Sequence, residues 1–325
     1  MVNLKYHSIQ FQLELSEWSP PLSKQKSIQP KSSCGQMQKI PIFIITCDRV
    51  GCLQATIDSY KKCIASPFEI VIHDNNSTYK PLLDYLKQLE QEGITVYHST
   101  KSVTVEEQLN SVAQSIDDWF TSHSASYYVV TDPDIALEGN CEDILELFAY
   151  LLDTVKDIEV VGPMLRIDDI PDFYPLKQRA ISRHTEQFWH KKPLTLRCRN
   201  KTIQYQSALI DTTFGMYRRG FRFHRLCKGY RIYAPYGARH LDWYINPAQM
   251  EEDQIYYLQH ASGVSHWSGT WLRESIRKDN KHASSEKLID RHKTTKEDAI
   301  LEDNKGWINR CRAKLKRAIS LDKEQ

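Results

Sequence analysis

The sequence has few glycines and lacks the motifs that mark common nucleotide sites. Only 12 of its 325 residues are glycine, and no G-x-G-x-x-G is present, so a Rossmann dinucleotide site is unsupported. Gly215 and Gly220 have the spacing of a phosphate-binding P-loop, but Phe221 and Arg222 stand where its lysine and hydroxyl residue should follow. The hydrolase motif G-x-S-x-G and the metalloprotease motif H-E-x-x-H are also absent.

The chain also lacks an excess of charge, paired cysteines and long apolar runs. Lysine and arginine total 43 against 41 acidic residues, a net charge of +2 that argues against a general nucleic-acid binder. The eight cysteines form no C-x-x-C pair and are typical of reduced thiols in a cytoplasmic protein. The most apolar early run, residues 40–47, is far shorter than the ~20 residues of a membrane helix, and no signal-peptide core is present.

What the sequence does contain predicts one large globular domain with two extensions. Hydrophobic residues make up 41% of the chain, which is enough for a substantial core. Residues 1–38 are rich in Ser, Gln, Lys and Pro, and we expect a loosely ordered tail there. We expect the domain over residues 39–272, with halves at 39–163 and 164–272, and a charged helical extension over 273–325. A basic face and Trp307 would suit this extension to an anionic membrane surface, although packing on the domain is an equally simple alternative.

Short apolar runs alternate with helical patterns from residue 40 onward. The runs predict strands at residues 40–46, 68–73, 94–98, 127–131 and 160–162, and the helical spacing predicts helices at 53–60, 82–89, 105–120 and 140–152. Thr104 and Glu107 form a capping box before the third helix, and Asn140 is the expected cap of the fourth. This alternation predicts an open, mainly parallel α/β sheet flanked by helices.

The pattern becomes irregular after Pro163. Residues 165–200 mix basic and aromatic side chains without a clear period, so we expect long loops there. Strand-like segments recur at 203–210 and 230–234. The second half should therefore be rich in loops.

Asp132-Pro133-Asp134 directly follows the predicted strand 127–131. Ligands of open α/β sheets bind at the carboxyl ends of the strands. Two carboxylates separated by one rigid residue can bind a hard divalent cation, which in turn can bridge phosphate oxygens. Taken alone, the tripeptide favours the alternative of a polar turn with two incidental acids.

Four motifs in order resemble those of GT-A-fold nucleotide-sugar glycosyltransferases, specifically family-2-like enzymes. Thr46-Cys47-Asp48-Arg49 stands where that family often has T-Y-N-R. His73-Asp74-Asn75-Asn76-Ser77-Thr78 is similar to V-D-N-x-S-T/D, Asn110 lies in a helix like the family's R-N helix, and Asp132-Pro133-Asp134 matches D-x-D. The acceptor signature Q-x-x-R-W is missing. The resemblance covers residues 40–270 and implies a GT-A-like fold.

The resemblance implies a role for several residues. Asp74 would accept a hydrogen bond from the nucleotide base, and Thr46, Arg49 and Asn110 would also face the nucleotide. Asp132 would contact ribose or metal, and Asp134 would bind Mn²⁺ or Mg²⁺ together with the diphosphate. His240 is the best-placed histidine for a further metal ligand, the alternative being a ring packed on Trp243; an imidazole would favour Mn²⁺.

An inverting transferase also needs a carboxylate that removes the proton of the acceptor hydroxyl. Asp211 is preferred because it ends the strand-like segment 203–210. Glu252 and Asp253 are the alternatives, since their acidic run resembles the family's E-D motif. The sequence leaves these candidates open.

The expected reaction is the metal-dependent transfer of a sugar from a nucleotide-sugar donor, most simply a UDP-sugar, to a glycan or lipid-linked acceptor. Synthesis of a cell-surface polysaccharide is a natural setting. Two alternatives remain from the sequence. A sugar-nucleotide pyrophosphorylase shares the strand pattern but normally opens with a loop rich in glycine and arginine, and here only Arg49 and Gly51 are present. A non-catalytic nucleotide- or glycan-binding protein on the same fold is the other.

Overall fold

The computed structural model describes residues 38–100, 104–189, 192–198 and 201–260. Almost all of the expected tail and the whole of the extension 273–325, including Trp307, lie outside these residues. No helix in the described part of the chain is long and apolar enough to span a membrane.

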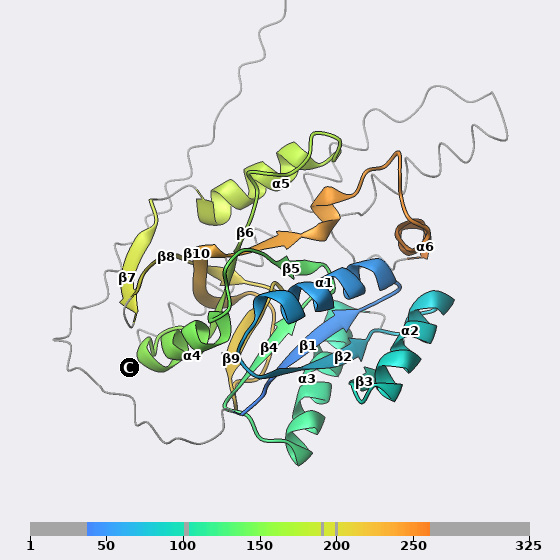
Figure 1. The fold of residues 1–325 in the computed structure, drawn as a ribbon, viewed down its shortest axis with the longest axis horizontal. Helices are drawn as coiled ribbons and strands as arrows, with labels where there is room; N and C mark the ends of the chain where they lie inside the picture. The colour runs from blue at the N-terminus through green and yellow to red at the C-terminus, as the bar shows by residue number, and fades with distance from the viewer. Residues whose placement is uncertain (1–37, 101–103, 190–191, 199–200, 261–325) are drawn as a thin grey trace, which may run out of the picture. The chain divides into compact units, whose positions relative to one another are not determined.

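The first half of the sheet is parallel, as its apolar runs predict. It contains β1 (Ile40–Thr46), β2 (Phe68–Asp74), β3 (Thr95–His98) and β4 (Tyr127–Thr131) in the order β3-β2-β1-β4. β1 is almost wholly buried because both of its faces are covered, which explains its continuous run of apolar residues. The carboxyl ends of these strands therefore share one edge of the sheet (Figure 1).

Four helices cover the two faces of this half. They are α1 (Val50–Cys63), α2 (Lys80–Gln91), α3 (Val105–Ser122) and α4 (Ile144–Thr154). Ile42 and Ile44 of β1 belong to the apolar cluster formed with α1, α2 and α4, whereas Phe43 points to the opposite face and packs edge-on against Trp119 of α3. The alternation of side chains along β1 thus separates the two apolar clusters. Figure 1 shows the helices flanking the sheet.

Of the two predicted helix starts, the one at Thr104 is confirmed and the one at Asn140 is wrong. The capping box is confirmed, because Thr104 Oγ1 accepts the Glu107 amide at 3.1 Å and Glu107 Oε2 accepts the Thr104 amide at 3.0 Å. The predicted cap at Asn140 is wrong, since α4 begins at Ile144 with Asp143 as its N-cap. Residues 140–143 form a turn in which Cys141 is fully buried. The helix therefore begins after this turn, and its N-cap lies three residues beyond Asn140.

The second half of the sheet is mixed. β9 (Gly215–Arg218) lies antiparallel between β4 and β6 (Val160–Leu165), and the order continues β6-β10-β8-β7 with β10 (Cys227–His240), β8 (Lys201–Ile210) and β7 (Leu194–Cys198). The short strand β5 (Ile135–Leu137) pairs antiparallel with the end of β10. The α/β fold class is confirmed, and the strand expected at 230–234 is only the centre of β10.

The expectation of long loops over residues 165–200 is wrong. This segment contains α5 (Lys177–His184), a π-helical turn η1 (Thr185–Trp189) and β7. α5 buries only Ala180 and His184, and such a small apolar stripe leaves no visible period in the sequence. A 3-10 turn, η2 (Leu241–Tyr244), and α6 (Glu252–His260) complete the described chain.

His73 of β2 is buried against α3, and this predicts acid sensitivity. Its Nδ1 lies 2.9 Å from Ser115 Oγ, and Nε2 has no hydrogen-bond partner. Burial lowers the pKa of His73 to about 4, below its usual value of ~6.5. The unfolded chain therefore takes up a proton before the folded chain does, so stability is retained above pH ~6.5 and lost as the pH falls towards 4.

We expect about 2 kcal/mol of the stability lost between pH 7.5 and pH 5 to come from His73. Urea unfolding of the parent and of His73→Gln at both pH values measures this share, because glutamine has no proton to gain. The matched control is His260→Gln, which changes an exposed histidine. Equal pH dependence in the parent and in His73→Gln would contradict the prediction.

Candidate active site

The loops after β1 and β2 are fastened to each other at the carboxyl edge of the sheet. Asp48 has a left-handed backbone (φ 53°), and its Oδ1 accepts the amides of Thr78 at 2.6 Å and Tyr79 at 2.7 Å, just before α2. The Asp48 amide donates to Ser77 Oγ at 3.0 Å. The conformation and the bonds of Asp48 together fix the direction in which the chain enters α1.

Arg49, the next residue, turns its guanidinium into a buried acidic cluster. Its Nη1 lies 2.7 Å from Asp134 Oδ2, and its Nη2 contacts Asp242 Oδ1. Asp134 and Asp242 are both at least 95% buried. One guanidinium thus joins the D-x-D segment after β4 to the turn η2 after β10.

His240 lies on the other side of Asp134. Its Nδ1 is 3.5 Å from Asp134 Oδ2, and its ring stacks on Trp243 with centroids 4.9 Å apart and planes 7° apart. The backbone brings these residues together, because β5 pairs Ile135 with His240 and the Leu241 amide donates to the Asp134 carbonyl at 2.7 Å. The ring of His240 is therefore packed on Trp243, and its Nδ1 also lies close to Asp134.

The donor set of this cluster fits a divalent cation. One ligand atom each from Asp134, His240 and Asp242 lies within 4.8 Å of the others, and all three side chains are buried. Asp134 Oδ1 is buried without a hydrogen-bond partner, as expected of an oxygen that is available to a ligand. Two carboxylates and one imidazole suit Mn²⁺ better than Mg²⁺, which prefers oxygen ligands alone.

The pKa values of the two carboxylates that hold Arg49 are shifted in opposite directions. Burial opposes the charge of both. His240 and Arg49 more than offset burial at Asp134 and lower its pKa below the usual value. Burial prevails at Asp242, whose pKa is raised, with the nearby charge of Asp134 acting in the same direction. Asp134 is therefore the carboxylate that keeps its negative charge more readily.

Asp132 is close to this cluster but has different partners. Its Oδ2 accepts from Thr212 Oγ1 at 2.6 Å, and its amide donates to the Thr212 carbonyl at 2.8 Å. Burial, reinforced by Asp134, raises the pKa of Asp132 to about 8. Asp211 precedes Thr212, and both of its carboxylate oxygens contact the Arg225 guanidinium. The end of β8 thus lies directly beside the D-x-D segment.

The residues predicted to face the nucleotide do not all lie at the same place in the fold. Asp74 ends β2, where its Oδ1 accepts the Ser77 amide at 3.1 Å and its Oδ2 lies 3.1 Å from His98 Nδ1. Thr46 ends β1 with a buried Oγ1 that lacks a hydrogen-bond partner. Asn110 lies in α3 with an exposed side chain. Asp74 and Thr46 therefore share the strand-end edge, and no contact joins Asn110 to the acidic cluster.

Of the acidic pair in α6, only Asp253 contacts this edge. Its Oδ2 accepts the Gly51 amide at 2.8 Å in the first turn of α1, where the helix dipole favours a negative charge. Glu252 is exposed. α6 also places the Tyr257 ring over the Arg49 guanidinium, 4.8 Å from its centroid. The helix therefore packs over the loop that carries Arg49.

Asp242 and Tyr257 belong to this site and were not among the predicted residues. The spacing His240-x-Asp242 at the end of a strand is a signal that could have found Asp242, since it places a second ligand type two residues after the first. For Tyr257 the sequence has no comparable signal, because a cation–π contact depends on how α6 packs.

The model of glycosyl transferase family 2 matches residues 42–222, which is more than half of the chain. No curated protein matches the chain. Solved structures similar to it include the mannosyltransferase PcManGT from Pyrobaculum calidifontis in complex with GDP-Man and Mn²⁺, which is 16% identical with a TM-score of 0.32 and covers 41% of this chain and 37% of its own.

Two further structures have the same level of similarity. TarS of S. aureus in complex with UDP-GlcNAc is 13% identical with a TM-score of 0.34, over 55% of this chain and 45% of its own. GalNAc-T7 with UDP, GalNAc and Mn²⁺ is 12% identical with a TM-score of 0.38, over 63% and 43%. The chain thus spans less than half the length of each of these proteins. On the match of the family model, the chain belongs to glycosyl transferase family 2.

Proposed function

We propose that the protein transfers a sugar from a nucleotide-sugar donor, most simply a UDP-sugar, to a hydroxyl of a glycan or lipid-linked acceptor. Building a cell-surface polysaccharide is the proposed setting. The observation that carries the proposal is the buried group of Asp134, His240 and Asp242 at the carboxyl edge of the sheet, with one Asp134 oxygen left without a partner. Family membership supports the same reaction class.

The proposed metal, Mn²⁺ or Mg²⁺, would be held by Asp134 and His240, with Asp242 added to the predicted set and Asp132 beside it. When bound, it would offset the negative charge of the departing diphosphate. The protein's own contribution is to keep two carboxylates and an imidazole close together in a buried site. Arg49 does this in the structure by contacting both carboxylates. We therefore assign Arg49 to the organisation of the acidic cluster rather than to direct contact with the base.

The donor nucleotide would lie along the ends of β1 and β2. Each oxygen of Asp74 has one partner and keeps a second lone pair, so Asp74 can still accept a hydrogen bond from the base. Thr46 Oγ1 has no partner at all and is available to the nucleotide. We propose the halves 39–163 and 164–272 as the nucleotide and acceptor sides of the domain.

For the acceptor proton we propose Asp211. It is half-buried beside Asp132, whereas Glu252 is exposed and Asp253 is engaged with the Gly51 amide. Asp211 forms an ion pair with Arg225, and this contact must break before Asp211 can take up a proton. Arg225 would therefore control when Asp211 acts as the base. The pyrophosphorylase alternative is weakened, because the one arginine of the loop after β1 is already paired with Asp134 and Asp242.

Donor binding and donor hydrolysis test the proposal. We expect UDP or another nucleoside diphosphate to raise the melting temperature more with Mn²⁺ than with EDTA, and Mn²⁺ to support slow hydrolysis of the matching nucleotide-sugar. Asp211→Asn should bind the donor and lose hydrolysis. Binding without hydrolysis in the parent would favour a non-catalytic binder, and no response to any nucleotide diphosphate would contradict the proposed function.

A further inference from the structure

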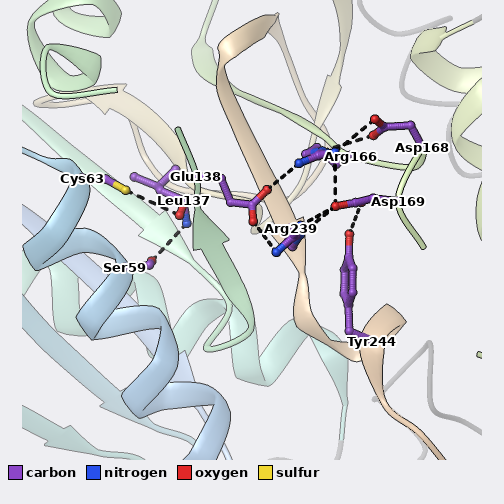
Figure 2. A network of polar contacts seen from close by, with 9 residues as sticks. All are labelled: Ser59, Cys63, Leu137, Glu138, Arg166, Asp168, Asp169, Arg239 and Tyr244. Atoms are coloured by element: carbon purple, nitrogen blue, oxygen red, sulfur yellow. Dashed lines mark hydrogen bonds and ion pairs between the residues drawn. The ribbon is translucent and has the colours of Figure 1, made fainter. Parts of the chain in front are cut away.

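We infer that Asp169 is a positioning residue that holds the segment Arg239–Tyr244 in the shape that the acidic cluster requires. This segment carries His240 and Asp242, so the inference rests on the proposed function and extends it to a residue outside the cluster. Figure 2 shows Asp169 between two side chains that come from the two ends of the segment.

The contacts of Asp169 connect both ends of that segment. Its Oδ2 accepts from Arg239 Nη2 at 2.6 Å and from Arg239 Nε at 2.9 Å, and its Oδ1 accepts the Tyr244 hydroxyl (Figure 2). Arg239 is the next-to-last residue of β10, and Tyr244 ends η2. A single carboxylate thus joins two residues five positions apart, and the chain between them forms a closed loop.

Asp169 is itself anchored to the sheet. Arg166 Nη2 lies 3.3 Å from Asp169 Oδ2, and the Arg166 amide donates to the Ala238 carbonyl at 2.9 Å. Glu138, at the end of β5, contacts Arg166 at 3.1 Å and Arg239 at 2.5 Å (Figure 2). Charge-assisted bonds of this kind are strong and directional, particularly where a guanidinium binds carboxylates through several nitrogens. The network therefore fixes Asp169 relative to β5 and β10 rather than to a loose loop.

The opposite side of the same segment forms the candidate metal site. His240 and Asp242 contact Asp134 and Arg49, and the Leu241 amide donates to the Asp134 carbonyl. Residues that orient metal ligands without touching the metal typically change metal affinity by about 10- to 100-fold when they are replaced. Asp169 has the contacts of such a residue, acting through Arg239 and Tyr244.

The test compares Asp169→Asn with Asp172→Asn. Asparagine at 169 keeps the shape but removes the charge that binds Arg239. Asp172 is the matched control, because it is an aspartate of the same loop, its side chain is 98% exposed and it pairs with Lys177 rather than with a residue of the network. Tyr244→Phe is a milder second variant that removes only the contact at Oδ1. Hydrogen–deuterium exchange of peptides covering residues 239–246 and Mn²⁺ affinity by electron paramagnetic resonance are the measurements, with melting temperature recorded in parallel.

We expect faster exchange over residues 239–246 and at least about tenfold weaker Mn²⁺ binding in Asp169→Asn, at temperatures where all variants are folded. Tyr244→Phe should change both quantities in the same direction by less, and Asp172→Asn should match the parent. Exchange and affinity in Asp169→Asn equal to those of Asp172→Asn would overturn the inference. If the parent binds no Mn²⁺, the metal-dependent function fails, and the exchange data alone decide whether Asp169 positions the segment.

Discussion

Replacing Asp134 by asparagine is expected to lower turnover at least about a hundredfold. The substitution keeps the volume of the side chain but removes the charge that the pKa of Asp134 favours. A metal ligand opposite a diphosphate is worth several kcal/mol in the transition state, and each ~1.4 kcal/mol lost there costs a factor of ten in rate. Steady-state hydrolysis or transfer rates over a Mn²⁺ titration measure the effect.

The fold should survive this substitution. Asparagine can still accept a hydrogen bond from Arg49, and Asp242 still contacts the same guanidinium. Asp84→Asn is the matched control, because it alters an exposed aspartate that pairs with Lys80 on the surface of α2. An Asp134→Asn enzyme that works at nearly the parental rate, with the same response to Mn²⁺, would rule out the proposed role of Asp134.

Asp74→Ala should instead weaken nucleotide binding even without metal.

Replacing Arg49 by methionine is expected to remove about 3–5 kcal/mol of unfolding free energy in the presence of EDTA. The substitution leaves two buried carboxylates close together without the cation that joins them, and a buried charge without its partner is strongly destabilising. The contact of Arg49 with the Tyr257 ring is lost as well. Urea unfolding of the parent and of Arg49→Met in EDTA measures the loss.

A divalent cation should compensate for the missing guanidinium. We expect Mn²⁺ to restore more stability in Arg49→Met than it adds to the parent, because in the variant the metal would supply the only positive charge between Asp134 and Asp242. The double variant Arg49→Met/Asp242→Asn removes one of the two charges, and it should be more stable in EDTA than Arg49→Met alone. A loss below about 1 kcal/mol, or an equal Mn²⁺ response in parent and variant, would contradict this account.

The strands of the parallel half could be predicted because a strand that is buried on both faces consists mainly of apolar residues. β1 and β4 are short apolar runs, β2 contains the apolar run Ile70–Ile72, and each of the three strands ends in a polar residue at the carboxyl edge of the sheet. The mixed half gives weaker signals. β9 has only four residues, and α5 buries just one alanine and one histidine. Both elements take their form from contacts with distant segments, which a local pattern does not record.

The residues of the candidate site also differ in how far the sequence indicates them. Asp134 and His240 could be predicted because each follows or ends a strand and carries a metal-ligating group. The pairing of Arg49 with Asp134 spans 85 positions in the sequence, and that of Arg49 with Asp242 spans 193. Which carboxylates lie next to the Arg49 guanidinium depends on how β5 pairs with β10. No spacing in the sequence contains that information.

The geometry of Asp48 explains how the sequence can depart from the family pattern at this position without cost. In the pattern T-Y-N-R, asparagine stands where this chain has Asp48. The bonds from the amides of Thr78 and Tyr79 both end on the single atom Oδ1, and the backbone at this residue is left-handed. An asparagine carbonyl can accept the same two bonds, and aspartate and asparagine are the non-glycine residues that best tolerate this conformation. The geometry therefore accommodates either residue at this position, whereas alanine would lose the acceptor and strain the turn.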